Sequence, residues 1–188
     1  LTRMKLQISL IKDEKAKSEL EVDVKEMTSM LDSYVSFVKT ESPEPIETIV
    51  INELINEITK TFEKNGVELT IKEKNTIQTS GRQIQLKRAF NNIIDNSQRY
   101  SKKIEIILYK NEKDCVIEFN DNGEGIPKDK YEDVFKPFFT LDPSRNKLKG
   151  ESGLGLTITR DIIRSHGGDV KLSESNLGGL QLKVLLPL

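Results

Sequence analysis

Apolar residues recur at heptad spacing over the first forty positions of the chain. Two stripes, each with intervals of three and four residues, are separated by the charged segment 12–15. Their members are Leu1, Met4, Ile8 and Ile11, and then Leu20, Val24, Met27, Leu31, Tyr34 and Val38. Such stripes predict two amphipathic helices joined by a turn. We expect an antiparallel hairpin over 1–41, whose apolar faces a second copy would cover in a four-helix bundle. The alternative is that the stripes pack on the rest of the same chain.

The pattern changes after Ser42-Pro43-Glu44-Pro45, where two prolines interrupt helical geometry. From 46 onward, helical periodicity alternates with strand-like alternation. Helices are predicted over 52–62, 80–100 and 154–164, with a short one near 128–135, and strands over 67–71, 104–109, 115–119, 170–172 and 180–186. Asn52 and Ser80 are candidate N-caps. The second part is therefore predicted to be an α/β sandwich, a mixed sheet with helices on one face, and the whole chain to be α+β.

Composition narrows the range of partners. The 29 basic and 30 acidic residues leave a net charge of -1, which removes the broad electrostatic basis for binding nucleic acid or a membrane surface. One cysteine excludes a disulfide framework and a Cys-based zinc site. No window approaches eighteen consecutive apolar residues, so no transmembrane span is predicted within the chain. A specific polyanion pocket is compatible with this balance of charge.

Polar side chains gather on one face of the helix predicted over 80–100. Asn92, Asn96 and Arg99 are spaced four and three residues apart, which aligns them. Two carboxamides and a guanidinium there could meet a metal-bound polyphosphate, because amide oxygen is a hard ligand suited to Mg²⁺. A solvated helix face is the alternative, and a pair of asparagines alone would favour it.

Two glycine-bearing segments have the composition of ligand-binding loops. In Asp121-Asn122-Gly123-Glu124-Gly125-Ile126-Pro127, the Asp121 carboxylate could accept a hydrogen bond from an exocyclic amine, although a hairpin turn explains the composition equally well. In Gly150-Glu151-Ser152-Gly153-Leu154-Gly155-Leu156, backbone amides at a helix start could bind an anion, without the Gly-Lys-Ser/Thr of a Walker motif. Three phenylalanines within 135–140 are predicted to anchor a mobile lid over 140–153.

Taken in this order, these segments resemble the N, G1, F and G2 boxes of the GHKL (Bergerat) ATP-binding fold of sensor histidine kinases. Leu177-Gly178-Gly179-Leu180 stands where a G3 box would be. The resemblance covers the whole chain, because 1–5 is similar to the segment after the phosphoacceptor box and 32–38 to the end of the second dimerisation helix. Within this family, the chain resembles the osmosensor-type, EnvZ-like kinases. The resemblance implies a dimerisation hairpin at 1–41 and an ATP-binding catalytic domain at 46–188.

The resemblance also implies ATP and Mg²⁺ as cofactors. Asn96 would bind Mg²⁺, with Asn92 supporting it at the phosphates or assisting the reaction. Arg99 and Tyr100 would contact phosphate and nucleotide, and Asp121 would accept from the adenine amino group. The other implied contacts are Gly123, Gly125 and Ile126 at the base, Thr140 in the lid, and Ser152, Gly153, Leu154, Gly155 and Leu156 at the triphosphate.

Three positions depart from the family pattern. Thr140 stands where a basic residue is frequent, so a cation for the γ-phosphate would come from Arg145, Lys147 or Lys149. Glu151 replaces a glycine and stiffens the lid. Leu180 replaces a Ser or Thr and weakens a polar link to the adenine region.

The only histidine, His166, follows the helix predicted over 154–164 and precedes two glycines. A structural role at the helix end is expected, since a cation or donor there complements the helix dipole. The resemblance places the phosphoacceptor histidine a few residues before Leu1. The chain is thus expected to be a piece of a longer protein, the cytoplasmic part of an inner-membrane-anchored bacterial sensor.

The intact protein is expected to transfer the γ-phosphoryl of Mg-ATP to that upstream histidine and then to an aspartate on a response regulator receiver domain. Its other expected partner is a second copy, through 1–41; no nucleic acid and no membrane contact are expected of this fragment. Two alternatives stay open. One is a GHKL serine kinase of the anti-sigma type, which usually lacks a heptad hairpin. The other is a non-catalytic nucleotide-binding dimerisation module, against which the intact Asn92 and Asn96 pair argues.

Overall fold

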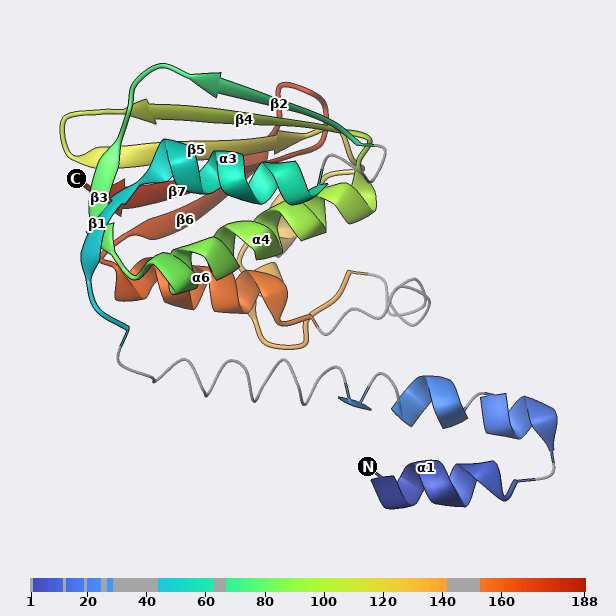
Figure 1. Ribbon diagram of the computed structural model, residues 1–188. Helices are drawn as coiled ribbons and strands as arrows, with labels where there is room; N and C mark the ends of the chain where they lie inside the picture. The colour runs from blue at the N-terminus through green and yellow to red at the C-terminus, as the bar shows by residue number, and fades with distance from the viewer. Residues whose placement is uncertain are drawn as a thin grey trace. The chain divides into compact units, whose positions relative to one another are not determined.

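The chain falls into two units in the computed structural model (Figure 1). The first comprises Leu1–Ser42 and Lys136–Leu154, and the second comprises Pro43–Phe135 and Gly155–Leu188. The residues that the structure describes are 2–11, 13–18, 20–24, 27–28, 44–62, 67–141 and 153–188. All the strands found in these residues belong to the second unit.

Helical structure opens the first unit. Helix α1 spans Thr2–Ser9, and residues 14–18, 20–24 and 27–28 are also helical. Before residue 14 the helix is interrupted, and Asp13 Oδ1 accepts the backbone amides of Lys15 (3.0 Å) and Ala16 (3.2 Å), as an N-cap does. The break that the charged segment predicts is therefore found.

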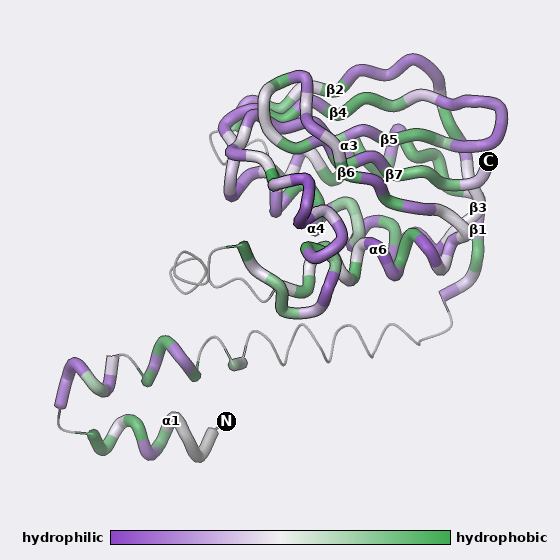
Figure 2. Tube along the Cα trace, turned by 180° about the vertical axis from the view of Figure 1, so that it is seen from behind, coloured by the Kyte–Doolittle hydropathy of each residue, from purple (hydrophilic) through white to green (hydrophobic). Residues whose placement is uncertain are grey.

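The apolar stripes of the first unit are only partly covered. Ile8 and Val24 are buried, whereas Leu20 and Met27 are exposed. Figure 2 shows hydrophobic and hydrophilic positions interleaved in the coloured part of α1. The last stripe members, from Leu31 onward, lie outside the residues that the structure describes. The hairpin over 1–41 and its pairing with a second copy stay predictions.

A five-stranded mixed sheet forms the centre of the second unit. Its strands, in spatial order, are β2 (Glu68–Glu73), β4 (Lys103–Lys110), β5 (Asp114–Asp121), β7 (Leu180–Pro187) and β6 (Asp169–Glu174). The β2–β4 pair is parallel, and the other neighbours are antiparallel. Strands β2, β6 and β7 lie where apolar and polar residues alternate in the sequence, whereas β4 and β5 contain runs of consecutive apolar residues. The predicted mixed sheet is confirmed.

Three helices cover one face of this sheet, side by side (Figure 1): α3 (Ile51–Phe62), α4 (Gln83–Tyr100) and α6 (Gly155–Ser165). The apolar face of α4 points inward, and the Phe90 ring lies 6.0 Å from that of Phe119 on β5. Burial of each such side chain stabilises the fold by about 1.5–3 kcal/mol. The predicted α+β class, with helices on one face, is confirmed. No helix within the described ranges combines the length and apolar character needed to cross a bilayer.

A small second sheet pairs β1 (Glu47–Val50) with β3 (Gln78–Gly81) in antiparallel register. Because Ser80 lies within β3, its prediction as the N-cap of the following helix is wrong. Helix α4 begins at Gln83, and its N-cap residue, Arg82, makes no side-chain capping bond.

Two side chains from elsewhere hold the amino end of α4. The Glu44 carboxylate accepts the amides of Ile84 (2.6 Å) and Gln85 (3.3 Å). His166 Nε2 accepts the Arg82 amide (3.0 Å), and its Nδ1 therefore carries the proton that it donates to the Ile162 carbonyl (2.7 Å). The predicted structural role of His166 at the end of α6 is thereby confirmed.

Helix α3 begins at Ile51, so the prediction that Asn52 precedes the helix as its cap is also wrong. The Asn52 side chain is buried, accepts the Ile77 amide (2.8 Å) and donates to the Asn75 carbonyl (3.0 Å). It therefore fixes the segment before β3 against α3. The short helix predicted near 128–135 is two 3₁₀ turns, η3 (Lys128–Lys130) and η4 (Asp133–Phe135).

Candidate functional site

Asp121 is the last residue of β5, and its side chain is 4% exposed. Its Oδ1 accepts the backbone amides of Gly123 (2.9 Å) and Leu180 (3.0 Å). The carboxylate thus joins the loop after β5 to the first residue of β7. Both amides use the same oxygen, so Oδ2 can accept a hydrogen bond from a ligand.

The backbone around this carboxylate is packed too closely for any side chain at Gly179. A Cβ there would overlap Asp121 Oδ1 and the Gly123 nitrogen, and would lie 2.7 Å from the Asp121 carbonyl oxygen. A Cβ at Gly123 would lie 2.8 Å from the Tyr100 carbonyl oxygen, at the end of α4. Three segments distant in the sequence therefore meet at Asp121.

The chemistry of Asp121 is set by burial and by hydrogen bonds. Desolvation raises the pKa of its carboxyl above the ordinary aspartate value, while the amides of Leu180 and Gly123 act against that rise. The Ser97 hydroxyl lowers the same pKa by a smaller amount. Ser97 is buried on α4 and was missed as a site residue; the signal for it is a hydroxyl among the apolar residues of that helix face.

This raised pKa makes the stability contribution of Asp121 depend on pH. The native state binds the proton more tightly than the unfolded chain, so the contribution is fully present below about pH 3.9 and is lost as pH rises through the raised folded-state pKa. We expect Asp121→Asn to remove this pH-dependent loss of stability. Urea unfolding of both proteins from about pH 4 to about pH 7 measures it. Parallel pH profiles for the wild type and the variant would contradict the prediction.

Helix α4 presents the predicted asparagines near the start of α6. Asn92 Nδ2 donates to the Gly155 carbonyl (3.3 Å), which also accepts from Thr159 Oγ1 (2.9 Å). Asn96 lies one turn further along and is half-buried. Within the described part of the chain, its carboxamide makes no hydrogen bond. Asn92 is therefore tied to α6, and Asn96 is available to a ligand.

The donor set at Asn96 fits a magnesium ion. A neutral amide oxygen is a hard ligand, and Mg²⁺ usually takes one or two protein oxygens and completes its shell with water and substrate phosphates. Arg99 and Tyr100 follow in the last turn of α4, both on its exposed side. The roles predicted for these four residues of α4 stay predictions.

The loop after β5 also contacts Gly179 through Gly125. Gly125 has φ +71°, and a Cβ there would lie 3.6 Å from the Gly179 carbonyl carbon. Ile126, which follows it, is half-buried. The structure therefore brings the G1 and G3 glycines together beside Asp121. Gly179 was not among the predicted site residues, and the Gly178-Gly179 pair was its signal in the sequence.

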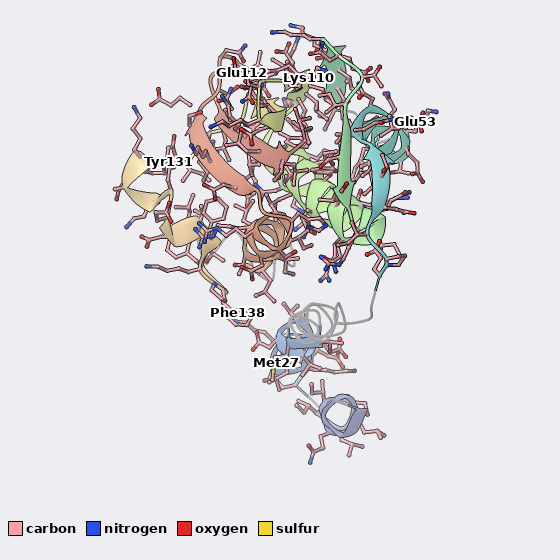
Figure 3. All side chains as sticks on the ribbon, turned by 90° about the vertical axis from the view of Figure 1, so that its left-hand side faces the viewer. Met27, Glu53, Lys110, Glu112, Tyr131 and Phe138 are labelled. Atoms are coloured by element: carbon pink, nitrogen blue, oxygen red, sulfur yellow. The ribbon has the colours of Figure 1, made fainter. Side chains whose placement is uncertain are left out.

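Of the three phenylalanines predicted to anchor a lid, Phe135 is buried, whereas most of the lid lies outside the described residues, so its anchoring stays a prediction. The Arg160 guanidinium of α6 lies 4.3 Å from the Phe135 ring centroid. Arg160 also pairs with Glu132 (3.0 Å), and Thr157 Oγ1 donates to the Phe135 carbonyl (2.9 Å). Phe138, labelled in Figure 3, is 53% exposed and has φ 62°.

Some predicted contacts lie in the other unit or outside the described residues. Thr140, Gly153 and Leu154 belong to the first unit, where the Phe138 amide donates to the Gly153 carbonyl (3.0 Å). Gly155 and Leu156 belong to the second unit, at the start of α6. The residues outside the described ranges are Arg145, Lys147, Lys149, Glu151 and Ser152. The predicted contacts with the triphosphate stay predictions.

Comparison with known proteins gives a family and several relatives. The family model described as "Histidine kinase-, DNA gyrase B-, and HSP90-like ATPase" matches residues 81–188. The chain is 29% identical over 189 residues to the sensor histidine kinase GtrS of Pseudomonas aeruginosa, covering 100% of the chain and 39% of that protein. It is 30% identical over 200 residues to the sensor histidine kinase CpxA of Escherichia coli, covering 100% of the chain and 44% of that protein. The chain thus spans less than half the length of these curated relatives.

Solved structures agree on the fold. The mycobacterial sensor histidine kinase MprB matches with a TM-score of 0.68 at 24% identity, covering 76% of this chain and 97% of that one. The catalytic domain of histidine kinase ThkA matches with a TM-score of 0.68 at 24% identity, covering 76% of this chain and 95% of that one. At this identity the likeness concerns the fold alone.

Proposed function

We propose that this chain, which belongs to the family of histidine kinase-, DNA gyrase B- and HSP90-like ATPases, is the ATP-binding catalytic part of a sensor histidine kinase. The observation that carries the proposal is the buried Asp121 carboxylate, oriented by the Gly123 and Leu180 amides beside the helix that bears Asn92 and Asn96. A carboxylate that can accept a hydrogen bond from an amino group, next to a helix that carries a candidate metal ligand, suits the binding of a nucleotide.

Asp121 would select the base. An ionised carboxylate only accepts hydrogen bonds, so it suits the amino group of adenine and rejects a base with a carbonyl at that position. A hydrogen bond to a charged group contributes about 1.5–3 kcal/mol. The backbone amides already hold the carboxylate in place, so ligand binding costs little further side-chain conformational entropy.

Asn96 would contribute an oxygen to Mg²⁺, and Asn92 would support the phosphates. The ion, when bound, would offset the charge that develops on the transferred phosphoryl group. Asn92 also donates to the Gly155 carbonyl, the first of α6, which would keep the start of this helix next to the phosphates. Phosphoryl transfer depends mainly on such positioning and charge neutralisation.

In the intact protein, the acceptor would be a histidine upstream of this chain. The bond between the γ-phosphorus and the oxygen that bridges it to the β-phosphorus would break and release ADP, while the unprotonated imidazole nitrogen would bond to phosphorus. The other ring nitrogen would pass its proton to solvent. An aspartate of a response regulator would then receive the phosphoryl group. The exposed Leu20 and Met27 support dimerisation through 1–41. An EnvZ-like type and a place as the cytoplasmic part of a membrane-anchored sensor belong to the same proposal.

The test uses the chain with a supplied dimerisation domain that carries an acceptor histidine. We expect the chain to bind Mg-ATP and to transfer labelled γ-phosphate to that domain, giving an acid-labile, alkali-stable product. An acid-stable phosphoserine on a partner would instead identify the anti-sigma type of kinase. Nucleotide binding without transfer to any acceptor would identify a non-catalytic module. Failure of both binding and transfer would overturn the proposal.

A further inference from the structure

The amino end of α4 has no capping side chain of its own. Arg82, at the N-cap, has extended backbone (φ -100°, ψ 108°) and makes no side-chain capping bond. The first amides of a helix lack intrahelical acceptors and need other partners. Glu44 supplies them from 40 residues upstream, with Oε1 on the Ile84 amide (2.6 Å) and Oε2 on the Gln85 amide (3.3 Å). One distant carboxylate therefore caps the helix.

Glu44 stands where the chain enters the second unit. That unit begins at Pro43, and Glu44 is flanked by prolines, which restrict the backbone on both sides. Strand β1 begins at Glu47, which pairs with Gly81. Within the residues that the structure describes, the chain coming from 1–42 is thus bonded to α4 before it joins any strand.

Helix α4 is also the helix that carries the asparagines of the proposed nucleotide site. At about 1.5 Å of rise per residue, Asn92 lies about 12 Å along the axis from Ile84, and Asn96 about 18 Å. The same helix is tied to α6 by the bond from Asn92 to Gly155. A change at its amino end therefore reaches the nucleotide site through one rigid element.

We propose that Glu44 is a positioning residue that fastens the segment 44–46 to the nucleotide-binding helix, so that this attachment and nucleotide binding favour each other. The coupling rests on the proposed function, whereas the attachment itself does not. Linkage requires that nucleotide tightens the Glu44 bond by the same factor by which the bond raises nucleotide affinity.

Residue-resolved hydrogen exchange on the full chain tests both parts. Without nucleotide, the Ile84 and Gln85 amides are expected to exchange slowly in the wild type and at least about tenfold faster in Glu44→Ala, because they lose their acceptor. The non-hydrolysable analogue AMP-PNP with Mg²⁺ is expected to slow these two amides by about threefold in the wild type, and the affinity for it to fall by about the same factor in Glu44→Ala. Glu44→Gln, which keeps one acceptor oxygen, is expected to lie between the two.

A matched variant separates positioning from capping. In Glu44→Ala combined with Arg82→Ser, a local hydroxyl replaces the distant cap, as serine is a favoured N-cap residue. We expect this variant to recover thermal stability but not nucleotide affinity, since the segment 44–46 stays detached. Full recovery of affinity would reduce Glu44 to a simple cap and overturn the coupling. Fast exchange of Ile84 and Gln85 in the wild type would overturn the attachment. If AMP-PNP does not bind at all, the proposed function and the coupling fail, and the attachment stands on the first measurement.

Discussion

Gly179→Ala is expected to abolish nucleotide binding and to lower the free energy of unfolding by about 3 kcal/mol or more. The added methyl group would overlap Asp121 Oδ1 and the Gly123 backbone nitrogen, neither of which is the free end of a flexible side chain. Relief requires β7 to move away from the loop after β5, which breaks the bond from the Leu180 amide to Asp121. Urea unfolding and titration with Mg-ATP measure the two effects.

The adjacent glycine provides the control for this substitution. Gly178 has φ +97°, and nothing lies within 4 Å of a Cβ built on it. Gly178→Ala is therefore expected to cost about 1–2 kcal/mol of backbone strain and to leave nucleotide affinity unchanged. If Gly179→Ala bound Mg-ATP as well as Gly178→Ala does, the close packing at Asp121 would have no bearing on the site.

Asn96→Ala is expected to reduce phosphotransfer at least about 100-fold, because the variant loses the proposed protein ligand of Mg²⁺. The fold should be little affected, since within the described residues the Asn96 carboxamide makes no bond that stabilises it. Transfer to a supplied dimerisation domain, measured over a series of Mg²⁺ concentrations, is the readout. Partial recovery at high Mg²⁺ would identify the lost interaction as a metal contact.

Two neighbouring asparagines make this prediction specific. Asn91→Ala, on another side of α4, should leave both transfer and stability near wild type. Asn92→Ala should lower stability as well as transfer, because it removes the bond to the Gly155 carbonyl. Equal losses of transfer in Asn91→Ala and Asn96→Ala would show that the helix, and not the Asn96 oxygen, is being perturbed.

The strands of the main sheet are predictable because local sequence determines them. Between β4 and β5, the turn residue Asn111 accepts the amides of Lys113 (2.9 Å) and Asp114 (2.7 Å) through its own side chain. The flanking strands contain the apolar runs Ile106-Ile107-Leu108 and Cys115-Val116-Ile117. Strands β1 and β3 were missed, because each has only four residues and neither is long enough for a clear alternation.

Helix starts are less predictable when the capping group is distant. Ser80 and Asn52 each have the residue type of an N-cap, but Ser80 belongs to β3 and Asn52 lies inside the first turn of α3. The acceptor at α4 is Glu44, 40 residues away. A pattern of neighbouring residues contains no information about such a partner, so tertiary contact overrides the local preference.

Only part of the candidate site is predictable from local sequence. Asn92, Asn96 and Asp121 carry recognisable chemistry, and their places on α4 and at the end of β5 follow from helical spacing and from the end of a strand. The importance of Gly179 becomes apparent only when β7 lies beside β5, because the clash that forbids a side chain involves atoms nearly sixty residues away in the sequence.

The position of β7 bears on how the protein matures during synthesis. Although β7 follows every other described strand in the sequence, it lies between β5 and β6, and its first amide orients Asp121. While this strand is still inside the ribosome, the nascent chain lacks the neighbour that pairs with β5. It also lacks one of the two amides that hold the Asp121 carboxylate. We therefore expect a polypeptide that stops before Leu180 to lack the oriented carboxylate of the proposed nucleotide site, so that nucleotide does not assist its folding.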